Sequence, residues 1–187
     1  VTDNKYLEAI ISSSRLKKYL TRDLMEKITN HARARNQNKI EPGIDIVIPA
    51  YKTDYFQETV SSIIAAIGDI PHTIYISDNC PTDEIEKKCH GLPVSYYRSD
   101  FKVIGNFSYG ISLGSRRFIH VICDDDVVDA NFYKTIFSKF DDLDSRYPFE
   151  HKSIVVGSNI INPQGYTIGT RNLGEARIIE DREVTRC

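Results

Sequence analysis

Short runs of β-branched residues alternate with stretches of helical periodicity from residue 44 onward, and this alternation constrains the fold more than any single motif does. Strands are predicted at 44–50, 72–77, 94–97, 118–123, 153–158 and 166–169. Helices are predicted at 56–67, 83–90, 106–113 and 129–143. Such alternation favours a mainly parallel sheet covered by helices on both faces. The predicted class is therefore α/β, of the Rossmann type.

The first forty residues differ from the remainder in pattern and in charge. Two helices are predicted there, at 5–11 and 21–34, the second with an apolar stripe made of Leu24, Met25, Ile28 and Ala32. Residues 1–40 carry a balance of +5, and residues 41–187 carry −7 because the whole chain carries −2. We expect a helical extension at 1–40, which packs on the domain at 41–187, makes peripheral contact with an anionic membrane surface, or contacts a partner.

The composition is that of an ordinary globular protein in a reducing compartment. A length of 187 residues suits one domain with a sizeable core, and no apolar run approaches the ~20 residues that span a bilayer. The four cysteines show no Cys-x-x-Cys pair and no zinc-ligand spacing. We predict a cytoplasmic protein, with contact at the inner face of the membrane left open, as is the oligomeric state. Nucleic acid is not an expected partner, since the formal net charge is −2.

Three consecutive carboxylates, Asp124, Asp125 and Asp126, follow the apolar run at 118–123 directly. Adjacent acids at the end of a strand repel one another unless a cation neutralises them. Mg²⁺ and Mn²⁺ prefer carboxylate oxygens, and Mg²⁺ is commonly held by one or two carboxylates together with substrate phosphates. The triplet is therefore either a metal site that binds a diphosphate or a solvated acidic loop.

Polar loops follow the other predicted strands as well. The loop at 49–54 follows the first strand, and the loop at 78–83 follows the second. Ligands of parallel sheets bind beyond the carboxyl ends of the strands. We therefore expect these two loops and the triplet at 124–126 to converge on one cleft.

Three motifs in these loops resemble those of a known family. They are IVIPAYK at 46–52, ISDNCPTD at 76–83 and VICDDDVV at 121–128, and their order and spacing are similar to those of family 2 glycosyltransferases with the GT-A fold. The segment at 100–106 is similar to the family's Asn-x-Gly-x-x-x-Asn, although Asp100 and Lys102 depart from it. The resemblance covers about residues 44 to 170.

The resemblance implies an activity and its reactants. Members of the family transfer a sugar from a nucleotide diphosphate donor with inversion at the anomeric carbon. For this chain it implies a donor of UDP type, a saccharide or lipid-linked acceptor, dependence on Mg²⁺ or Mn²⁺, and a role in the synthesis of cell-surface polysaccharide.

The resemblance also assigns roles to residues. It implies nucleotide binding by Pro49, Ala50, Tyr51, Asp78, Asn106, Asp124 and Asp125, and metal binding by Asp124 and Asp126. Structural roles are open beside these: Tyr51 can cap the sheet, and Asp78 can form an Asx turn. The three acids also allow a second register, with Asp124 and Asp125 as the functional pair.

Inversion requires a general base that removes the proton of the acceptor hydroxyl. In the family this carboxylate lies well downstream of the metal motif. The candidates that remain in this sequence are Glu180 and Asp181, for which a solvated surface position is the competing interpretation. We expect the chain to hold the donor-binding part and to lack the acceptor part.

Two other functions remain open. A sugar nucleotidyltransferase would also bind a metal and a nucleotide, but it would carry a glycine-rich loop after its first strand, and 49–54 contains no glycine. The non-enzymatic alternative is a module that binds a nucleotide sugar without turnover. Metal-dependent hydrolysis of the donor distinguishes an enzyme from such a module.

Overall fold

The computed structural model describes residues 41–146, 156–162 and 164–171. The helices predicted at 5–11 and 21–34 lie outside the described residues, as do Glu180 and Asp181. The chain divides into two compact units, with the boundary between Thr135 and Ile136. Each unit is described by itself.

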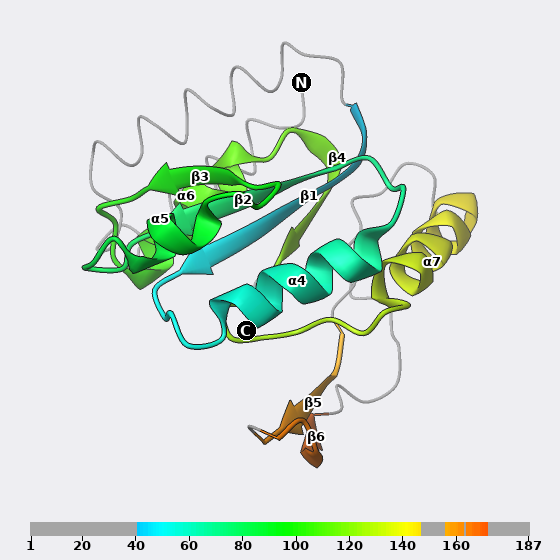
Figure 1. Cartoon of the computed structure of the whole chain (residues 1–187). Helices are drawn as coiled ribbons and strands as arrows, with labels where there is room; N and C mark the ends of the chain where they lie inside the picture. The colour runs from blue at the N-terminus through cyan, green and yellow to red at the C-terminus, as the bar shows by residue number, and fades with distance from the viewer. Residues whose placement is uncertain (1–40, 147–155, 163, 172–187) are drawn as a thin grey trace, which may run out of the picture. The chain divides into compact units, whose positions relative to one another are not determined.

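A parallel sheet of four strands forms the centre of the first unit (Figure 1). Its strands are β1 (Glu41–Ala50), β2 (His72–Asp78), β3 (Ser95–Arg98) and β4 (Arg116–Val121). Their order is β3-β2-β1-β4, and β1 pairs in parallel with both β2 and β4. The predicted α/β class and the parallel sheet are confirmed. The arrangement of the strands and helices is consistent with a Rossmann-like fold.

Helices cover both faces of this sheet (Figure 1). The connecting helices are α4 (Phe56–Ile67), α5 (Glu84–Cys89) and α6 (Val103–Leu113). Figure 1 shows α4 and α5 on one face and α6 on the other, as expected when the chain reverses direction across the sheet between β3 and β4. Among the described residues, no helix has the length and apolar character needed to cross a membrane.

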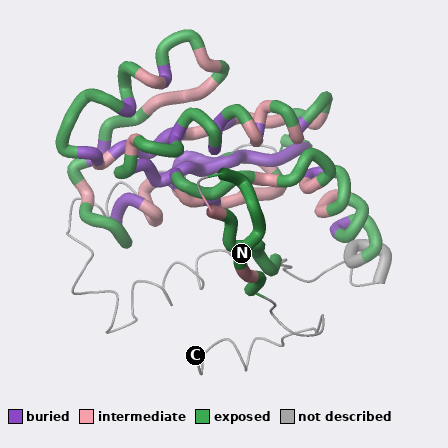
Figure 2. The backbone as a smooth tube through the Cα atoms, turned by 60° about the horizontal axis from the view of Figure 1, so that its bottom comes forward, coloured by how far each residue is buried: buried purple, intermediate pink, exposed green. Residues whose placement is uncertain are grey.

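The core is centred on β1, whose last eight residues are all buried (Figure 2). Side chains of a strand alternate between the two faces of its sheet. Ile46 and Ile48 are fully buried, as are Phe56, Val60 and Ile63 of α4. Burial of each such side chain contributes about 1.5–3 kcal/mol, so this strand and helix form the main apolar layer.

The opposite face of β1 is approached closely by α6. A Cβ atom added at Gly110 would lie 2.6 Å from Cγ1 of Val47 and 3.2 Å from Cβ of Ser77. Only glycine therefore allows the helix backbone to come this near to β1 and β2. The close contact holds the second half of α6 against β1 and the carboxyl end of β2.

The first strand begins earlier than its sequence predicts. The strand was predicted to start at residue 44, but β1 starts at Glu41. Glu41 pairs with Arg116 across a register shift, and their side chains form an ion pair at 3.0 Å. Gly43 lies within this register shift and has a φ of +104°. Its Cα approaches Pro71 so closely that a Cβ would collide with the Pro71 carbonyl.

Several other predicted bounds move by a few residues. Helix α6 begins at Val103 rather than at residue 106, so that Asn106 lies in its first turn. The last helix, α7 (Phe132–Arg146), begins three residues later than predicted. Asp129 instead forms an Asx turn, in which its Oδ1 accepts a hydrogen bond from the Asn131 amide at 2.8 Å.

His120 of β4 lies against the start of α7. Its ring centroid is 5.0 Å from that of Phe132 and 5.7 Å from that of Tyr133. Its Nδ1 is 3.1 Å from the Tyr133 hydroxyl. Burial lowers the pKa of His120 to about 4, so the imidazole is neutral near pH 7. His120 is thus packed against aromatic side chains of α7.

The described part of the second unit contains an antiparallel hairpin, β5 (Ser158–Ile161) with β6 (Thr167–Arg171). A turn connects the two strands, in which Oδ1 of Asn162 accepts hydrogen bonds from the amides of Gln164 and Tyr166. The strand predicted at 153–158 is wrong in its position, because Val156 and Gly157 are not in a strand and β5 begins at Ser158. Residues 153–155 lie outside the described residues.

Candidate functional site

The candidate site lies at the carboxyl edge of the sheet, where the order of the strands reverses. From β1 the chain proceeds outward through β2 to β3, and it then returns to the other side of β1 to form β4. Such a reversal is where open α/β sheets bind ligands. The loops after β1 and β4 flank it, and they carry Tyr51 and the acidic triplet.

Asp124 joins these two loops. Its Oδ2 accepts hydrogen bonds from the backbone amides of Tyr51, at 2.6 Å, and Lys52, at 2.5 Å. Its backbone carbonyl accepts a third, from the Thr59 hydroxyl of α4 at 3.1 Å. The residue is 6% exposed. Hydrogen bonds to an ionised acceptor are stronger than neutral ones, so this carboxylate holds the β1–α4 loop against the end of β4.

The other two acids are exposed and differ in their partners. Asp125 forms an ion pair with the ammonium group of Lys52. Asp126 lies in a turn closed by a hydrogen bond from its amide to the Cys123 carbonyl, at 3.3 Å. Ligand atoms from Cys123, Asp125 and Asp126 all lie within 4.8 Å of one another. The turn therefore gathers three potential metal ligands, one of which contacts the β1–α4 loop through Lys52.

The donor set fits a hard divalent cation through its two carboxylates. Mg²⁺ and Mn²⁺ prefer oxygen, and Mg²⁺ commonly uses one or two protein carboxylates. Burial, and then the negative charge of Asp126, raise the pKa of the Cys123 thiol, so near pH 7 Cys123 is the neutral and poorer ligand. Asp125 and Asp126 are thus the pair that could hold the ion, whereas an oxygen of the predicted ligand Asp124 already accepts two amide hydrogen bonds.

Asp78 ends β2 as predicted, with its carboxylate fully buried. Oδ1 accepts a hydrogen bond from the Cys80 amide at 2.7 Å, which is the Asx turn considered from the sequence. Oδ2 accepts from the Tyr96 hydroxyl and from Nη1 of Arg98, each at 2.7 Å. Burial and then the bond to Asp78 raise the pKa of Tyr96 to about 12. The carboxylate thus joins the β2 loop to β3.

Asn106 is placed beneath the site rather than in it. It is 1% exposed, and its Nδ2 donates hydrogen bonds to the Ser77 carbonyl at 2.7 Å and to Oδ1 of Asn79 at 3.1 Å. Its Oδ1 accepts one from the Ser77 hydroxyl at 2.5 Å. Nδ2 of Asn79 in turn donates to the Phe101 carbonyl at 2.9 Å. Asn106 therefore fixes Asn79, which faces the cavity described next.

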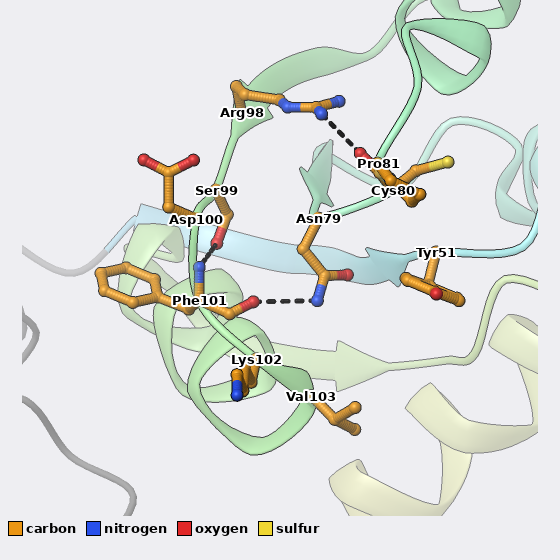
Figure 3. Close-up of a pocket in the computed structure, with 10 residues that line it drawn as sticks. All are labelled: Tyr51, Asn79, Cys80, Pro81, Arg98, Ser99, Asp100, Phe101, Lys102 and Val103. Carbon is orange, nitrogen blue, oxygen red and sulfur yellow. Dashed lines mark hydrogen bonds between the residues drawn. The ribbon is translucent and has the colours of Figure 1, made fainter.

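A cavity of about 460 Å³ opens beside the carboxyl ends of β1, β2 and β3 (Figure 3). In Figure 3 the Tyr51 ring lies on one side of it, and the chain from Arg98 to Phe101 lies on the other. The volume falls within the usual range for small-molecule sites. Its lining residues come from three loops and are Tyr51, Asn79, Cys80, Pro81, Arg98, Ser99, Asp100, Phe101, Lys102 and Val103.

Nucleotide binding was predicted for Pro49, Ala50 and Tyr51, and these residues differ in where they lie. Pro49 and Ala50 are buried within β1, and the Ala50 carbonyl accepts a hydrogen bond from the Asn79 amide at 3.0 Å. Tyr51 is 58% exposed and lines the cavity. Of the three, Tyr51 is therefore the one whose side chain can contact a ligand.

Sequence reasoning missed three residues of this site: Lys52, Asn79 and Arg98. Arg98 donates to the carbonyls of Thr82 and Cys80 as well as to Asp78, so it closes the second loop onto β3. The rule that sites lie beyond the carboxyl ends of strands would have selected it, because it ends the third strand. Lys52 carried no comparable signal, because its partner Asp125 is 73 residues away.

No protein-family model matches this chain, and no curated protein matches it either. The fold and the geometry of the site are therefore the basis for the function proposed below.

Proposed function

We propose that this chain contains the donor-binding domain of a metal-dependent, inverting glycosyltransferase of the GT-A type. The donor would be a nucleotide diphosphate sugar, with UDP favoured as the nucleotide, and the acceptor a saccharide or a lipid-linked saccharide. Synthesis of cell-surface polysaccharide at the cytoplasmic face of a membrane is the setting that we propose, with residues 1–40 as the membrane-contacting part.

One observation carries the proposal. Asp124 joins the loop that presents Tyr51 to the cavity with the turn that presents Asp125 and Asp126. A nucleotide diphosphate has the same two chemical parts, an aromatic base and a charged diphosphate. Asp125 and Asp126 do not line the cavity, but Asp124 ties their turn to the loop of Tyr51. An aromatic side chain at a cavity and a pair of carboxylates on the adjoining turn are suited to bind both parts of one molecule, since aromatic rings stack on bases and carboxylates hold the cation that a diphosphate requires.

The residues take roles that follow from their contacts. The ring of Tyr51 is available to stack on the base, and Asn79 supplies the amide that faces the cavity. Asp78 and Asn106 shape the cavity through buried hydrogen bonds rather than by contact with the nucleotide. A divalent cation at Asp125 and Asp126 would stabilise the charge that develops on the departing diphosphate.

A calorimetric panel of UDP-, GDP- and dTDP-sugars, with and without Mn²⁺, tests the proposal. One donor should bind, and its affinity should fall at least tenfold when Mn²⁺ is omitted or when the Asp126→Ala variant is used. Asp141→Ala, which removes an exposed acid of α7, is the matched control and should bind as the parent does. Binding of no donor, or binding indifferent to both Mn²⁺ and Asp126, would show the proposal to be wrong.

Turnover is tested separately with the donor that binds. Slow, Mn²⁺-dependent release of the nucleoside diphosphate, lost in Asp126→Ala, is expected of a transferase domain in the absence of an acceptor. Binding without any release would instead identify a nucleotide-sugar-binding module.

A further inference from the structure

We propose that Lys52 is an exchangeable internal cation, which neutralises Asp125 until a divalent cation binds there and which then transfers its charge to the diphosphate of the ligand. This inference rests on the proposed function, because it concerns the same pair of carboxylates. It adds a residue and an order of events that neither the motifs nor the metal site require.

Two kinds of contact hold Lys52 at the triplet. Its backbone amide donates to Asp124 at 2.5 Å, and its ammonium group pairs with Asp125. The first contact is partly buried and fixes the backbone of the loop. The second is exposed, since the side chains of Lys52 and Asp125 are 62% and 32% exposed. The backbone of Lys52 is therefore anchored while its side chain can move.

A divalent cation and the Lys52 ammonium group would compete for the negative charge of the Asp125 carboxylate. The cation would sit among ligand atoms that all lie within 4.8 Å of one another, and the Asp125 carboxylate belongs to both groups. Two positive charges at such a distance repel each other. Lysine side chains are ammonium groups near pH 7 in general. Binding of the cation should therefore release Lys52 rather than deprotonate it.

The released side chain has a nearby anionic partner when a diphosphate is present. Tyr51, the preceding residue, lines the cavity, and the Lys52 ammonium group contacts Asp125. A lysine ammonium is a compact charge on a flexible stem, which suits it to bind phosphate oxygens. Lys52 thus follows directly the residue proposed to contact the base, and it contacts a proposed ligand of the cation.

Lys52→Met tests the inference through binding alone, with two probes. Titration of Mn²⁺ followed by electron paramagnetic resonance should show Mn²⁺ bound about two- to fivefold more tightly than by the parent, because an exposed competing ion pair is lost. Calorimetry with inorganic pyrophosphate in saturating Mg²⁺ should show binding about tenfold weaker, because one charged hydrogen-bond donor is lost. The opposite signs are diagnostic, since damage to the loop would weaken both.

Lys87→Met is the matched control. Lys87 is 66% exposed and forms an ion pair with an aspartate, Asp83, so its replacement removes the same charge and the same kind of pair. It should leave both affinities unchanged. Lys52→Arg, which keeps the positive charge, should recover most of the binding of pyrophosphate. Thermal unfolding of each variant checks that the loop and the core are intact.

The possible results separate this inference from the proposed function. If Lys52→Met binds Mn²⁺ no more tightly than the parent, or binds pyrophosphate equally well, the exchange is disproved while the metal site stands. If the parent protein binds no Mn²⁺, both the exchange and the proposed metal site are disproved.

Discussion

The Tyr51 amide donates a hydrogen bond of 2.6 Å to Oδ2 of Asp124, across 73 residues of chain. The bond connects the end of the central strand with the end of the edge strand that pairs with it. It makes Asp124 a structural residue of the candidate site, in addition to any contact with a ligand. The other two acids of the triplet are left to face solvent.

Replacement of Asp124 should therefore destabilise the domain as well as impair binding. Asp124→Ala leaves two backbone amides without their acceptor, and we expect a loss of about 1–3 kcal/mol in the free energy of unfolding. Urea denaturation measures it. Asp125→Ala removes an exposed acid and should change stability by less than about 0.5 kcal/mol. Equal losses in the two variants would contradict the role given to Asp124.

Asn106 should prove to be a residue of stability rather than of ligand contact. Asn106→Leu keeps the approximate size of the side chain but removes its hydrogen bonds to the Ser77 carbonyl and hydroxyl, at a cost of about 2 kcal/mol. The hydroxyl keeps only its longer bond, of 3.3 Å, to the backbone carbonyl of residue 106. Ser108→Ala, on the exposed side of the same helix, is the control and should be nearly neutral. A stable Asn106→Leu protein that fails to bind nucleotide would show that Asn106 contacts the ligand directly.

Gly110→Ala should destabilise the protein although alanine favours helices. The helical preference is worth about 1 kcal/mol in favour of alanine. The added Cβ, however, would lie 2.6 Å from Val47 in the buried strand, and such overpacking costs about 1–3 kcal/mol. Thermal denaturation should therefore show a lower midpoint. Ser112→Ala in the same helix should shift the midpoint little, and a Gly110→Ala variant more stable than the parent would show that α6 can move away from the sheet.

His120 should make stability depend on pH in the acidic range. Its pKa is about 4 in the folded protein and 6.5 in its ordinary state, so the unfolded chain binds the proton more tightly. Stability is then fully present above pH 6.5 and falls as the pH decreases toward 4, by about 3 kcal/mol in total from this group. Free energies of unfolding measured between pH 7 and pH 4.5 should fall less steeply for His120→Gln than for the parent. Parallel curves would contradict the assignment.

Much of the fold could be predicted because its signals are local. The helix at 56–67 was placed to the residue, since its apolar positions recur at helical spacing and Gly68 follows it. The start of β1 was not, because Glu41 belongs to the strand only through its pairing with Arg116, which lies far along the chain. Likewise, the first turn of α6 forms where Gly105 and Asn106 can be buried against β2.

The location of the candidate site could be predicted from the sequence, but the roles of its individual acids could not. The rule for parallel sheets brought Tyr51, Asp78 and the triplet to one edge, as the structure has them. It could not show that the carboxylates of Asp78 and Asp124 accept internal hydrogen bonds while Asp125 and Asp126 stay exposed. Which of several adjacent acids turns inward depends on the amides that approach it from β1, and these become neighbours only in the folded chain.

The strand order β3-β2-β1-β4 has a consequence for the order in which the protein folds. Strands β1, β2 and β3 pair in succession along the chain, whereas β4 pairs with β1 across all the strands and helices between them. Contacts between residues far apart in sequence close slowly, because a long loop loses entropy. The candidate site would thus be among the last parts to assemble, and a newly made chain should resist proteolysis in its first three strands before it can bind any ligand.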